Sequence, residues 1–249
     1  MRAGARKFIK NLLATLFWVA AWHILALRMD NLLLLPTPLQ VAKCLGGLVQ
    51  TAAFWRITAV SIGRILLGAL VAVGLGVVLA VATCASDIAD ALVAPVMTVV
   101  QATPVASFTI LVLIWLDRDW VPVLICGMMV LPVVWSNVRA GIRETDRGLL
   151  EMAKVYRLKP WQVLKRIYVP SVLPYFRAAC SSALGLGWKA GIAAEVLTVP
   201  KQSIGKMISE SKLYVLTEEL FAWTLTVVLL SLLIQKVILK LLKGREGQC

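Results

Sequence analysis

The sequence predicts an all-α polytopic membrane protein, a bundle of about six transmembrane helices with both termini in the cytoplasm. Three observations lead to this prediction: an apolar composition, six long runs that carry few charges, and an uneven distribution of Lys and Arg between those runs. Of the 249 residues, 60% are hydrophobic, and the mean hydropathy is +0.84, whereas soluble domains are about 45–50% apolar. A soluble core of this size could not bury the excess, so we expect lipid to solvate it.

Six runs are long enough, or nearly long enough, to cross about 30 Å of hydrocarbon as helices. The second run is expected to extend upstream past Arg64, and Lys189 and Glu195 interrupt the fifth. Prolines in the third and fourth runs are compatible with kinked helices, because neighbouring helices can satisfy the carbonyls that a proline frees. The six runs are Asn11–Leu27, Ile65–Ser86, Ala91–Leu116, Trp120–Val138, Ala178–Pro200 and Leu220–Gln235, the last continuing to Leu242.

Lys and Arg are concentrated on one side of these runs. If the N-terminus is inside, the inside segments hold 17 Lys and Arg residues and the outside segments hold 7. The positive-inside rule therefore predicts that both termini are cytoplasmic. The same clustering between apolar runs argues against nucleic-acid binding as the reason for the net charge of +13. The inside segments are 1–10, 84–92, 139–177 and the tail from Lys236, and the outside segments are 28–56, 117–120 and 200–217.

The N-terminal end resembles a signal peptide, because four positive charges precede an apolar stretch. That stretch is long for a signal peptide and no A-x-A cleavage site follows it, so we expect an uncleaved first span. Pro36 and Pro38 then stop this span, and Leu39 to Trp55 can form a short helix along the outer surface of the bundle or membrane. A partly re-entrant segment is the alternative for this stretch.

Small residues recur every four positions in the second and fifth runs. Such a stripe lets another helix approach closely, although an Ala- and Gly-rich composition could also produce it by chance. In the fifth run, the next step of the stripe is Glu195. The two stripes are Gly68, Ala72, Gly76 and Ala80, and Ala179, Ala183, Gly187 and Gly191.

Lys189 and Glu195 are candidate functional residues, because a charge inside a span is costly and should face the bundle interior, a partner or water. They are six residues apart, about 240° of rotation on a straight helix, so they cannot easily pair with each other. Glu195 either hydrogen-bonds a neighbouring helix or lines a pathway. Lys189 either binds an anionic substrate or extends towards the cytoplasm, and Trp188 is a further candidate in this segment.

The longest inside loop, residues 139–177, is predicted to hold two short amphipathic helices. Asp146 can cap a helix that begins at Arg147. A second helix can begin at Pro160, a residue that is tolerated in a first turn, and Trp161 lies on its apolar face. These helices have no deep core of their own, so they either dock on a cytoplasmic partner or pack on the ends of the protein's own spans.

The same loop carries a sequence motif. Glu151-Met152-Ala153 is followed, after Arg157, by a stretch from Trp161 to Pro170. These residues resemble the EAA loop of binding-protein-dependent ABC permeases, whose pattern is E-A-A, three residues, G, nine residues and then I-x-L-P. Arg157 stands where the family has glycine. Because a left-handed turn is costly for arginine, we expect the turn to be carried instead by Leu158–Lys159.

Further residues resemble the nitrate/sulfonate/taurine branch of that family. They are Leu35-Pro36-Thr37-Pro38, Trp188 with Ala193-Ala194-Glu195, and Ser203-Ile204-Gly205. The resemblance implies a type I ABC importer permease fold. It also implies one transmembrane permease domain over residues 1–249, with a core at 57–242 and a cytoplasmic coupling loop at 140–176.

The resemblance also implies partners for this chain. Two copies of the permease would form the pathway, an ATPase dimer would bind ATP and Mg²⁺ on the cytoplasmic side, and an extracytoplasmic binding protein would deliver the solute. That solute would be a sulfonate, a nitrate-like oxyanion, or a vitamin or pyrimidine precursor, and the location would be the bacterial inner membrane. The coupling role would fall on Glu151, Ala153, Arg157, Leu158, Pro160, Trp161, Val163 and Leu164.

No enzyme site is expected on this chain. The five cysteines form no C-x-x-C pair, and His23, the single histidine, cannot supply a catalytic triad. Gly205-Lys206 does not belong to a phosphate-binding loop, because Pro200 occupies the position of its first glycine. We therefore expect no catalytic residue, metal or bound cofactor. The alternative, a secondary transporter or channel, would explain the spans but not the spacing of the EAA loop.

Overall fold

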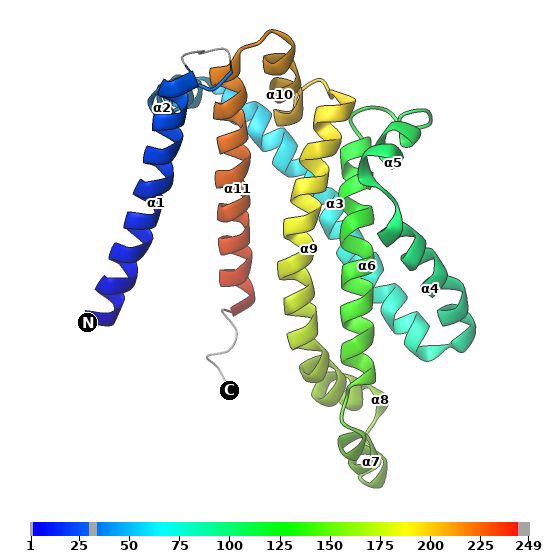
Figure 1. Ribbon diagram of the computed structural model, residues 1–249. Coiled ribbons are helices and arrows are strands. Elements are labelled where there is room, and N and C mark those ends of the chain that lie inside the picture. Colours follow the sequence, from blue (N-terminus) through cyan, green and yellow to red (C-terminus); the bar gives the residue numbers. More distant parts are fainter. Residues whose placement is uncertain (1, 30–33, 244–249) are drawn as a thin grey trace.

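The computed structural model describes residues 2–29 and 34–243, and this part of the chain is almost entirely helical (Figure 1). The prediction of an all-α protein is therefore confirmed. The elements are α1 (Arg2–Met29), α2 (Pro38–Val49), α3 (Ala52–Ala85), α4 (Asp87–Ala102), α5 (Val105–Val112), α6 (Val121–Arg143), α7 (Arg147–Val155), α8 (Pro160–Val163), the π-helical segment η1 (Leu164–Tyr168), α9 (Val169–Thr198), α10 (Ile204–Leu213) and α11 (Thr217–Lys243).

Four helices of the described chain are long enough and apolar enough to cross a membrane: α1, α3, α6 and α11. The pair α4 and α5 would make a fifth span if it is counted as one. Helix α9 is also long, at 30 residues, but Lys189, Glu195 and several glycines and serines make it more polar. The six predicted runs therefore correspond to five long helices and one bent pair.

The third run is not the continuous span that was predicted for Ala91–Leu116. It begins earlier, at Asp87, where the Ser86 hydroxyl accepts a hydrogen bond from the Ala89 amide, and the chain bends by 103° between α4 and α5. The bend lies at Thr103, whose ψ of 126° is extended. The following Pro104 disfavours a helical conformation for Thr103 and supplies no N–H to continue α4.

Helices α3, α6 and α9 form the packed centre of the bundle. The small residues predicted to form stripes lie at their contacts. A Cβ on Gly68 would lie 2.2 Å from the Val123 carbonyl oxygen of α6, and a Cβ on Gly187 would lie 2.7 Å from the Val130 side chain. Gly191 brings α9 equally close to Ile65 of α3. Small residues thus permit α3, α6 and α9 to approach one another closely. A membrane bundle needs such close packing because apolar burial does not drive helices together in lipid.

The segment after the first span forms two elements instead of the one short helix predicted for Leu39 to Trp55. Thr37 caps α2, accepting a hydrogen bond from the Gln40 amide while the Gln40 side chain accepts one from the Thr37 amide. The Thr51 hydroxyl then caps α3, so Trp55 already belongs to that helix. Helix α2 lies at the end of the bundle where α1 ends and α11 begins (Figure 1).

The ends of the bundle differ in what they carry. Helices α2 and α10 and the turn between α5 and α6 lie at one end, whereas α7 and α8 lie at the other, together with the start of α1 and the end of α11 (Figure 1). This is the relative placement that two cytoplasmic termini and a cytoplasmic loop require. The tail beyond Lys243, which the charge count assigned to the cytoplasm, and residues 30–33 of an outside segment lie outside the described residues.

Candidate coupling segment and intramembrane polar network

Helix α7 begins at Arg147, as predicted, because the Asp146 carboxylate accepts a hydrogen bond of 2.7 Å from the Gly148 amide. At its other end, the amide of Leu158 donates to the Ala153 carbonyl over 2.9 Å, and the amide of Arg157 donates to the Lys154 carbonyl over 3.1 Å. This pair of bonds is the Schellman arrangement that closes many helices.

The Schellman turn places Arg157 itself in the left-handed region, with φ of 52°. The expectation that Leu158–Lys159 would carry the turn is therefore wrong. The position that is glycine in the family pattern keeps its left-handed geometry here with an arginine, at a cost of about 1–2 kcal/mol. The two hydrogen bonds that close α7 hold the residue in this conformation.

The second helix of the loop begins at Pro160, as predicted. Pro170 does not end it, however, because the π-helical segment η1 carries the chain without interruption into α9. The Val169 amide donates to the Leu164 carbonyl, one residue further back than in an α-helix. Pro170 then occupies the first turn of α9, and because it has no N–H, it donates no hydrogen bond back to the preceding turn in η1. The loop helix and the predicted fifth span are thus one continuous rod from Pro160 to Thr198.

We call α7, α8 and η1 together, residues 147–168, the projecting segment, because α7 lies beyond the ends of α6 and α9 (Figure 1). Ala153 and Ile167 are buried, so the segment is anchored by its inner face. Trp161 is 69% exposed, and so are two residues that the sequence prediction omitted, Val155 at 79% and Tyr156 at 72%. Val155 and Tyr156 lie just before the turn at Arg157, and their apolar character at that place in the sequence could have identified them as coupling candidates.

The remaining residues assigned to coupling by resemblance lie on the same segment. Leu158 and Val163 are half-buried, whereas Glu151, Arg157, Pro160 and Leu164 are exposed. The segment therefore presents a mixed surface of exposed apolar and charged groups. An exposed apolar cluster of this kind on a projecting element is typical of a surface that another protein covers.

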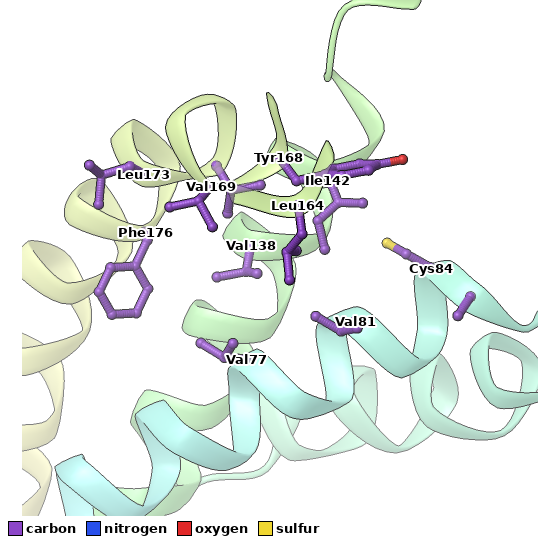
Figure 2. Close-up of a pocket in the computed structure, with 12 residues that line it drawn as sticks. Val77, Val81, Cys84, Val138, Ile142, Leu164, Tyr168, Val169, Leu173 and Phe176 are labelled. Atoms are coloured by element: carbon purple, nitrogen blue, oxygen red, sulfur yellow. The ribbon is translucent and has the colours of Figure 1, made fainter. Parts of the chain in front are cut away.

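A cavity of about 580 Å³ lies where the projecting segment joins the bundle (Figure 2). Helix α3 contributes Val77, Val81 and Cys84 to it, while η1 and the start of α9 contribute further apolar side chains. The Tyr168 hydroxyl and the Cys84 thiol are the polar side-chain groups of this lining. Such a lining is unsuited to a polar or ionic solute, so we do not assign the cavity to the substrate.

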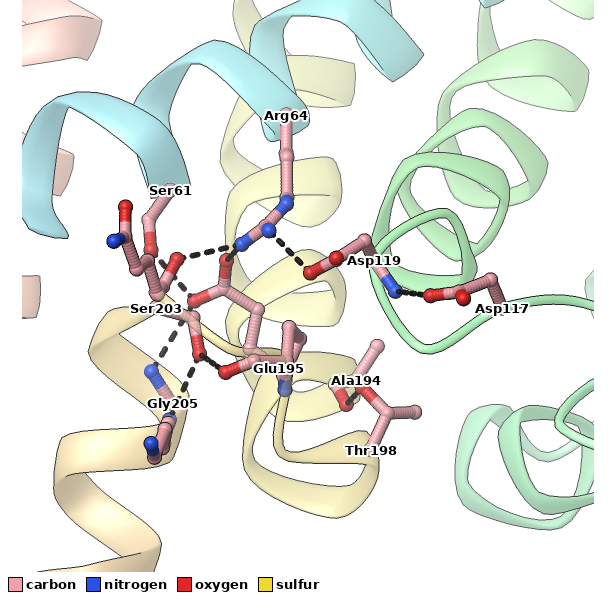
Figure 3. Close-up of polar contacts among 12 residues, drawn as sticks. Ser61, Arg64, Asp117, Asp119, Ala194, Glu195, Thr198, Ser203 and Gly205 are labelled. Carbon is pink, nitrogen blue, oxygen red and sulfur yellow. Dashed lines mark hydrogen bonds and ion pairs between the residues drawn. The ribbon is translucent and has the colours of Figure 1, made fainter.

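At the opposite end of the bundle, the carboxylate of Glu195 is fully buried (Figure 3). Its Oε2 accepts a hydrogen bond of 2.8 Å from the Ser61 hydroxyl of α3 and one of 3.2 Å from the Gly205 amide of α10. Its Oε1 lies 3.8 Å from the Arg64 guanidinium. Glu195 thus contacts two other elements, in agreement with the hydrogen-bonding role considered for it.

Arg64 is the centre of this polar network. One nitrogen of its guanidinium pairs with Asp119 in the turn between α5 and α6, and another donates to the Gln202 carbonyl over 2.7 Å (Figure 3). The network therefore joins α3, α9, the turn before α6 and the turn before α10. The sequence marked Arg64 as an intramembrane charge, but it could not identify partners that lie so far away along the chain.

The network also supplies hydrogen-bond acceptors for the backbone amides in the first turn of α10. The Ser61 hydroxyl accepts from the Ile204 amide, Glu195 accepts from the Gly205 amide, and the Ser203 hydroxyl accepts from the Lys206 amide. A carboxylate at a helix N-terminus is favoured by the helix dipole. Gly205 is needed for this close approach, because a Cβ on it would lie 2.3 Å from the Glu195 Cβ and 2.4 Å from backbone atoms of α9.

Lys189 and Trp188 lie in different surroundings from Glu195. Trp188 is buried, and its indole nitrogen donates to the Val227 carbonyl of α11 over 3.3 Å. Lys189 is exposed, and no ion pair of the described residues includes it. Lys189 and Glu195 therefore lie on different faces of α9, as their spacing predicts. In residues 2–29 and 34–243, no three His, Cys, Asp or Glu side chains gather as a metal site would require.

Comparison with known proteins places this architecture in a family. The model of the family described as "Binding-protein-dependent transport system inner membrane component" matches residues 65–243, from within α3 to the end of α11. The match includes both the projecting segment and Glu195.

Individual relatives agree with that match. The putative aliphatic sulfonates transport permease protein SsuC of Bacillus subtilis is 25% identical over 89% of this chain and 81% of its own length. The taurine transport system permease protein TauC of Escherichia coli is 23% identical, over 86% and 80% respectively. The bicarbonate transport system permease protein CmpB of Synechocystis is 27% identical, over 66% and 58%. This chain is therefore an ABC transporter permease, a multi-pass inner-membrane protein of the binding-protein-dependent family and of its sulfonate/taurine/nitrate branch.

Proposed function

We propose that this permease subunit couples to a separate ATPase through the projecting segment and forms the pathway of a small anionic solute. In this proposal, two copies of the chain form the pathway, and an extracytoplasmic binding protein delivers the solute. ATP and Mg²⁺ are bound by the ATPase dimer, and this chain binds no cofactor. Both termini and the projecting segment lie in the cytoplasm, which the excess of Lys and Arg on that side supports.

The observation that carries the coupling role is the exposure of apolar side chains on the projecting segment, at the end of α7 and at the start of the continuous helical stretch from Pro160 to Thr198. Val155, Tyr156 and Trp161 are each more than two-thirds exposed, and covering them with a partner would remove apolar area from water at roughly 25 cal/mol per Å². Because α8, η1 and α9 are continuous, a displacement of the segment by the ATPase would act directly on a helix at the centre of the bundle.

The proposed substrate class comes from the relatives. Aliphatic sulfonates, taurine and bicarbonate each carry an anionic sulfonate or oxyanion group, and these are the solutes for which the relatives are named. We therefore place a sulfonate or a small oxyanion ahead of a vitamin or pyrimidine precursor. Membership of a binding-protein-dependent family disfavours the alternative of a secondary transporter or channel.

The test of coupling is co-purification in mild detergent after co-expression with an ABC ATPase and a solute-binding protein from the same genome. Trp161→Ala should reduce recovery of the ATPase and uncouple the ATP hydrolysis that the binding protein stimulates. Trp18→Ala is the matched control, because Trp18 on α1 is 70% exposed and lies outside the family match. Equal ATPase recovery and equal stimulated hydrolysis in both variants would show that the projecting segment is not the docking site.

A further inference from the structure

One face of α9 is exposed through the depth of the bundle. Between Ala179 and Thr198, the exposed residues are spaced three or four apart, so they form a single stripe along the helix. The stripe is uncharged except for one residue, Lys189. Its members are Ser182, Leu186, Lys189, Ala193 and Leu197.

Lys189 lies at the middle of the predicted fifth span, Ala178–Pro200. It precedes the end of α9 at Thr198 by nine residues, which is about 14 Å of helix rise. In the other direction, twenty residues separate it from Val169. A lysine side chain cannot span such distances to reach either interface. An ammonium group at this depth is costly against lipid, so the surface that it faces contains water or polar groups.

Nothing within the described chain neutralises this ammonium. Glu195, the carboxylate of α9, is fully buried and is held by Arg64, Ser61 and the Gly205 amide. Lys189 itself takes part in no ion pair of the described residues. The stripe therefore carries an uncompensated positive charge.

A second irregular feature lies at the start of α5, a helix that contacts α9. Helix α5 shares an apolar cluster with Ala190 and Ala194 of α9 through Phe108 and Val112, and Thr103, at the break before α5, lies close to Met128 and Met129 of α6. Non-helical backbone at membrane depth occurs where it is buried in protein or lines a water-filled cavity. The first turn of α5 follows Pro104 and has no side-chain cap, and its amide groups add further positive potential.

We infer that the exposed stripe of α9 lines the solute pathway and that Lys189 favours anionic solutes within it. This inference rests on the proposed function and names a residue that sets the charge selectivity of the pathway. The positive charge attracts a sulfonate or oxyanion, because a unit charge a few ångströms away acts on a passing ion even where water or polar groups are present. Trp188, although next in sequence, is buried against α11 and does not belong to the stripe.

The test needs no knowledge of the substrate. Ala193→Cys places a thiol one turn from Lys189 on the stripe, and two thiol reagents of opposite charge report the local potential. These are the anionic sulfonatoethyl and the cationic trimethylammonioethyl methanethiosulfonates, applied to the full transporter in nanodiscs. The parent chain, which keeps its own cysteines, gives the background rate. Leu229→Cys on α11, where the leucine is 50% exposed, is the control for a residue that faces lipid.

We expect Ala193→Cys to react faster than Leu229→Cys and to prefer the anionic reagent. Adding Lys189→Gln should lower the ratio of anionic to cationic rates roughly tenfold, while Lys189→Arg should preserve it, because a nearby unit charge acts in opposite directions on the two reagents. An unchanged ratio in Lys189→Gln, or equal rates at Ala193→Cys and Leu229→Cys, would overturn the inference. Co-purifying ATPase is measured in the same samples, so failure of the coupling proposal is seen separately.

Discussion

The guanidinium of Arg64 lies 3.8 Å from the fully buried carboxylate of Glu195, although the two residues belong to different helices and are far apart in the sequence. The same guanidinium pairs with Asp119, so one cation is shared by two anions. This arrangement fixes the positions of α3 and α9 at the end of the bundle opposite the projecting segment. A buried charge that loses its partner is strongly destabilising, and this makes the network a sensitive point of the fold.

Glu195→Ala is expected to destabilise the protein by about 2–4 kcal/mol, because it leaves Arg64 with Asp119 as its one anionic partner among the described residues and removes the acceptor of the Ser61 and Gly205 donors. Glu195→Gln should cost less, since its amide oxygen can still accept both bonds. Thermal unfolding in detergent, monitored by size-exclusion chromatography, measures the order of stability of these two variants and the parent chain. Glu210→Ala is the control, because that side chain is partly exposed and, among the described residues, its ion pair is an i,i+4 pair with Lys206. A Glu195→Ala protein as stable as Glu210→Ala would contradict the structural role.

Gly205→Ala is expected to separate the start of α10 from α9, because the added Cβ would lie 2.3–2.4 Å from side-chain and backbone atoms of α9. Backbone cannot move as a side-chain end can, so we expect loss of stability of several kcal/mol, in the range of overpacked cores or above. Gly74→Ala in α3 is the matched control, because nothing lies within 4 Å of its added Cβ.

The Gly74 control should be neutral or should stabilise the helix by about 0.5–1 kcal/mol, since glycine disfavours a helix interior. Both variants are compared by the same unfolding measurement. If Gly205→Ala unfolds at the same temperature as Gly74→Ala, the close approach of α10 to Glu195 is not a feature of the folded protein.

The sequence predicts the helical elements well, because apolar runs and caps are local properties. Asp146 and Pro160 correctly identified the starts of α7 and α8 for this reason. The sequence predicted kinks at the prolines of the third and fourth runs, but not which proline would break its helix. Pro104 separates α4 from α5, whereas Pro95 and Pro132 lie inside α4 and α6. Whether a proline bends a helix depends on neighbours that satisfy the freed carbonyl, and those neighbours are not local.

The sequence also identified the intramembrane charges but not their partners. Glu195 was a candidate because a charge within an apolar run is costly wherever it occurs. Its contact with Arg64 depends on how α3 and α9 cross, which the spacing of small residues limits but does not determine. At Arg157 a local preference gave a wrong prediction. The cost of positive φ for arginine favoured a turn at Leu158–Lys159, but the two hydrogen bonds that close α7 hold Arg157 in the left-handed region.

Arg157→Gly is expected to stabilise the turn after α7 by about 1 kcal/mol, because glycine adopts positive φ without the Cβ penalty that arginine incurs. The projecting segment opens locally, so amide hydrogen exchange of α7 is the suitable measurement, and exchange should slow about fivefold at this free energy. Lys159→Gly is the control, since Lys159 has an extended conformation with φ of −65° and gains nothing from glycine. Faster exchange in Arg157→Gly than in the parent would contradict the strained turn.

Asp90→Asn is expected to loosen the start of α4. The Asp90 carboxylate pairs with Arg139 and, over 3.1 Å, with Arg143, both on α6, and the Arg139 guanidinium also lies 5.0 Å from the centre of the Trp135 ring. Removing the one anion leaves two neighbouring cations that repel each other, so we expect amide exchange in the first two turns of α4 to rise several-fold, and more at low salt than at high salt.

Asp87→Asn separates this ion-pair effect from the helix dipole. Asp87 lies in the same first turn of α4 and is exposed, so both variants lose the same favourable interaction of a carboxylate with the helix N-terminus, about 0.3–1 kcal/mol. Only Asp90→Asn also removes the connection to α6. Exchange that rises equally in both variants would therefore show that the dipole alone is responsible, and that α4 is not held to α6 by these arginines.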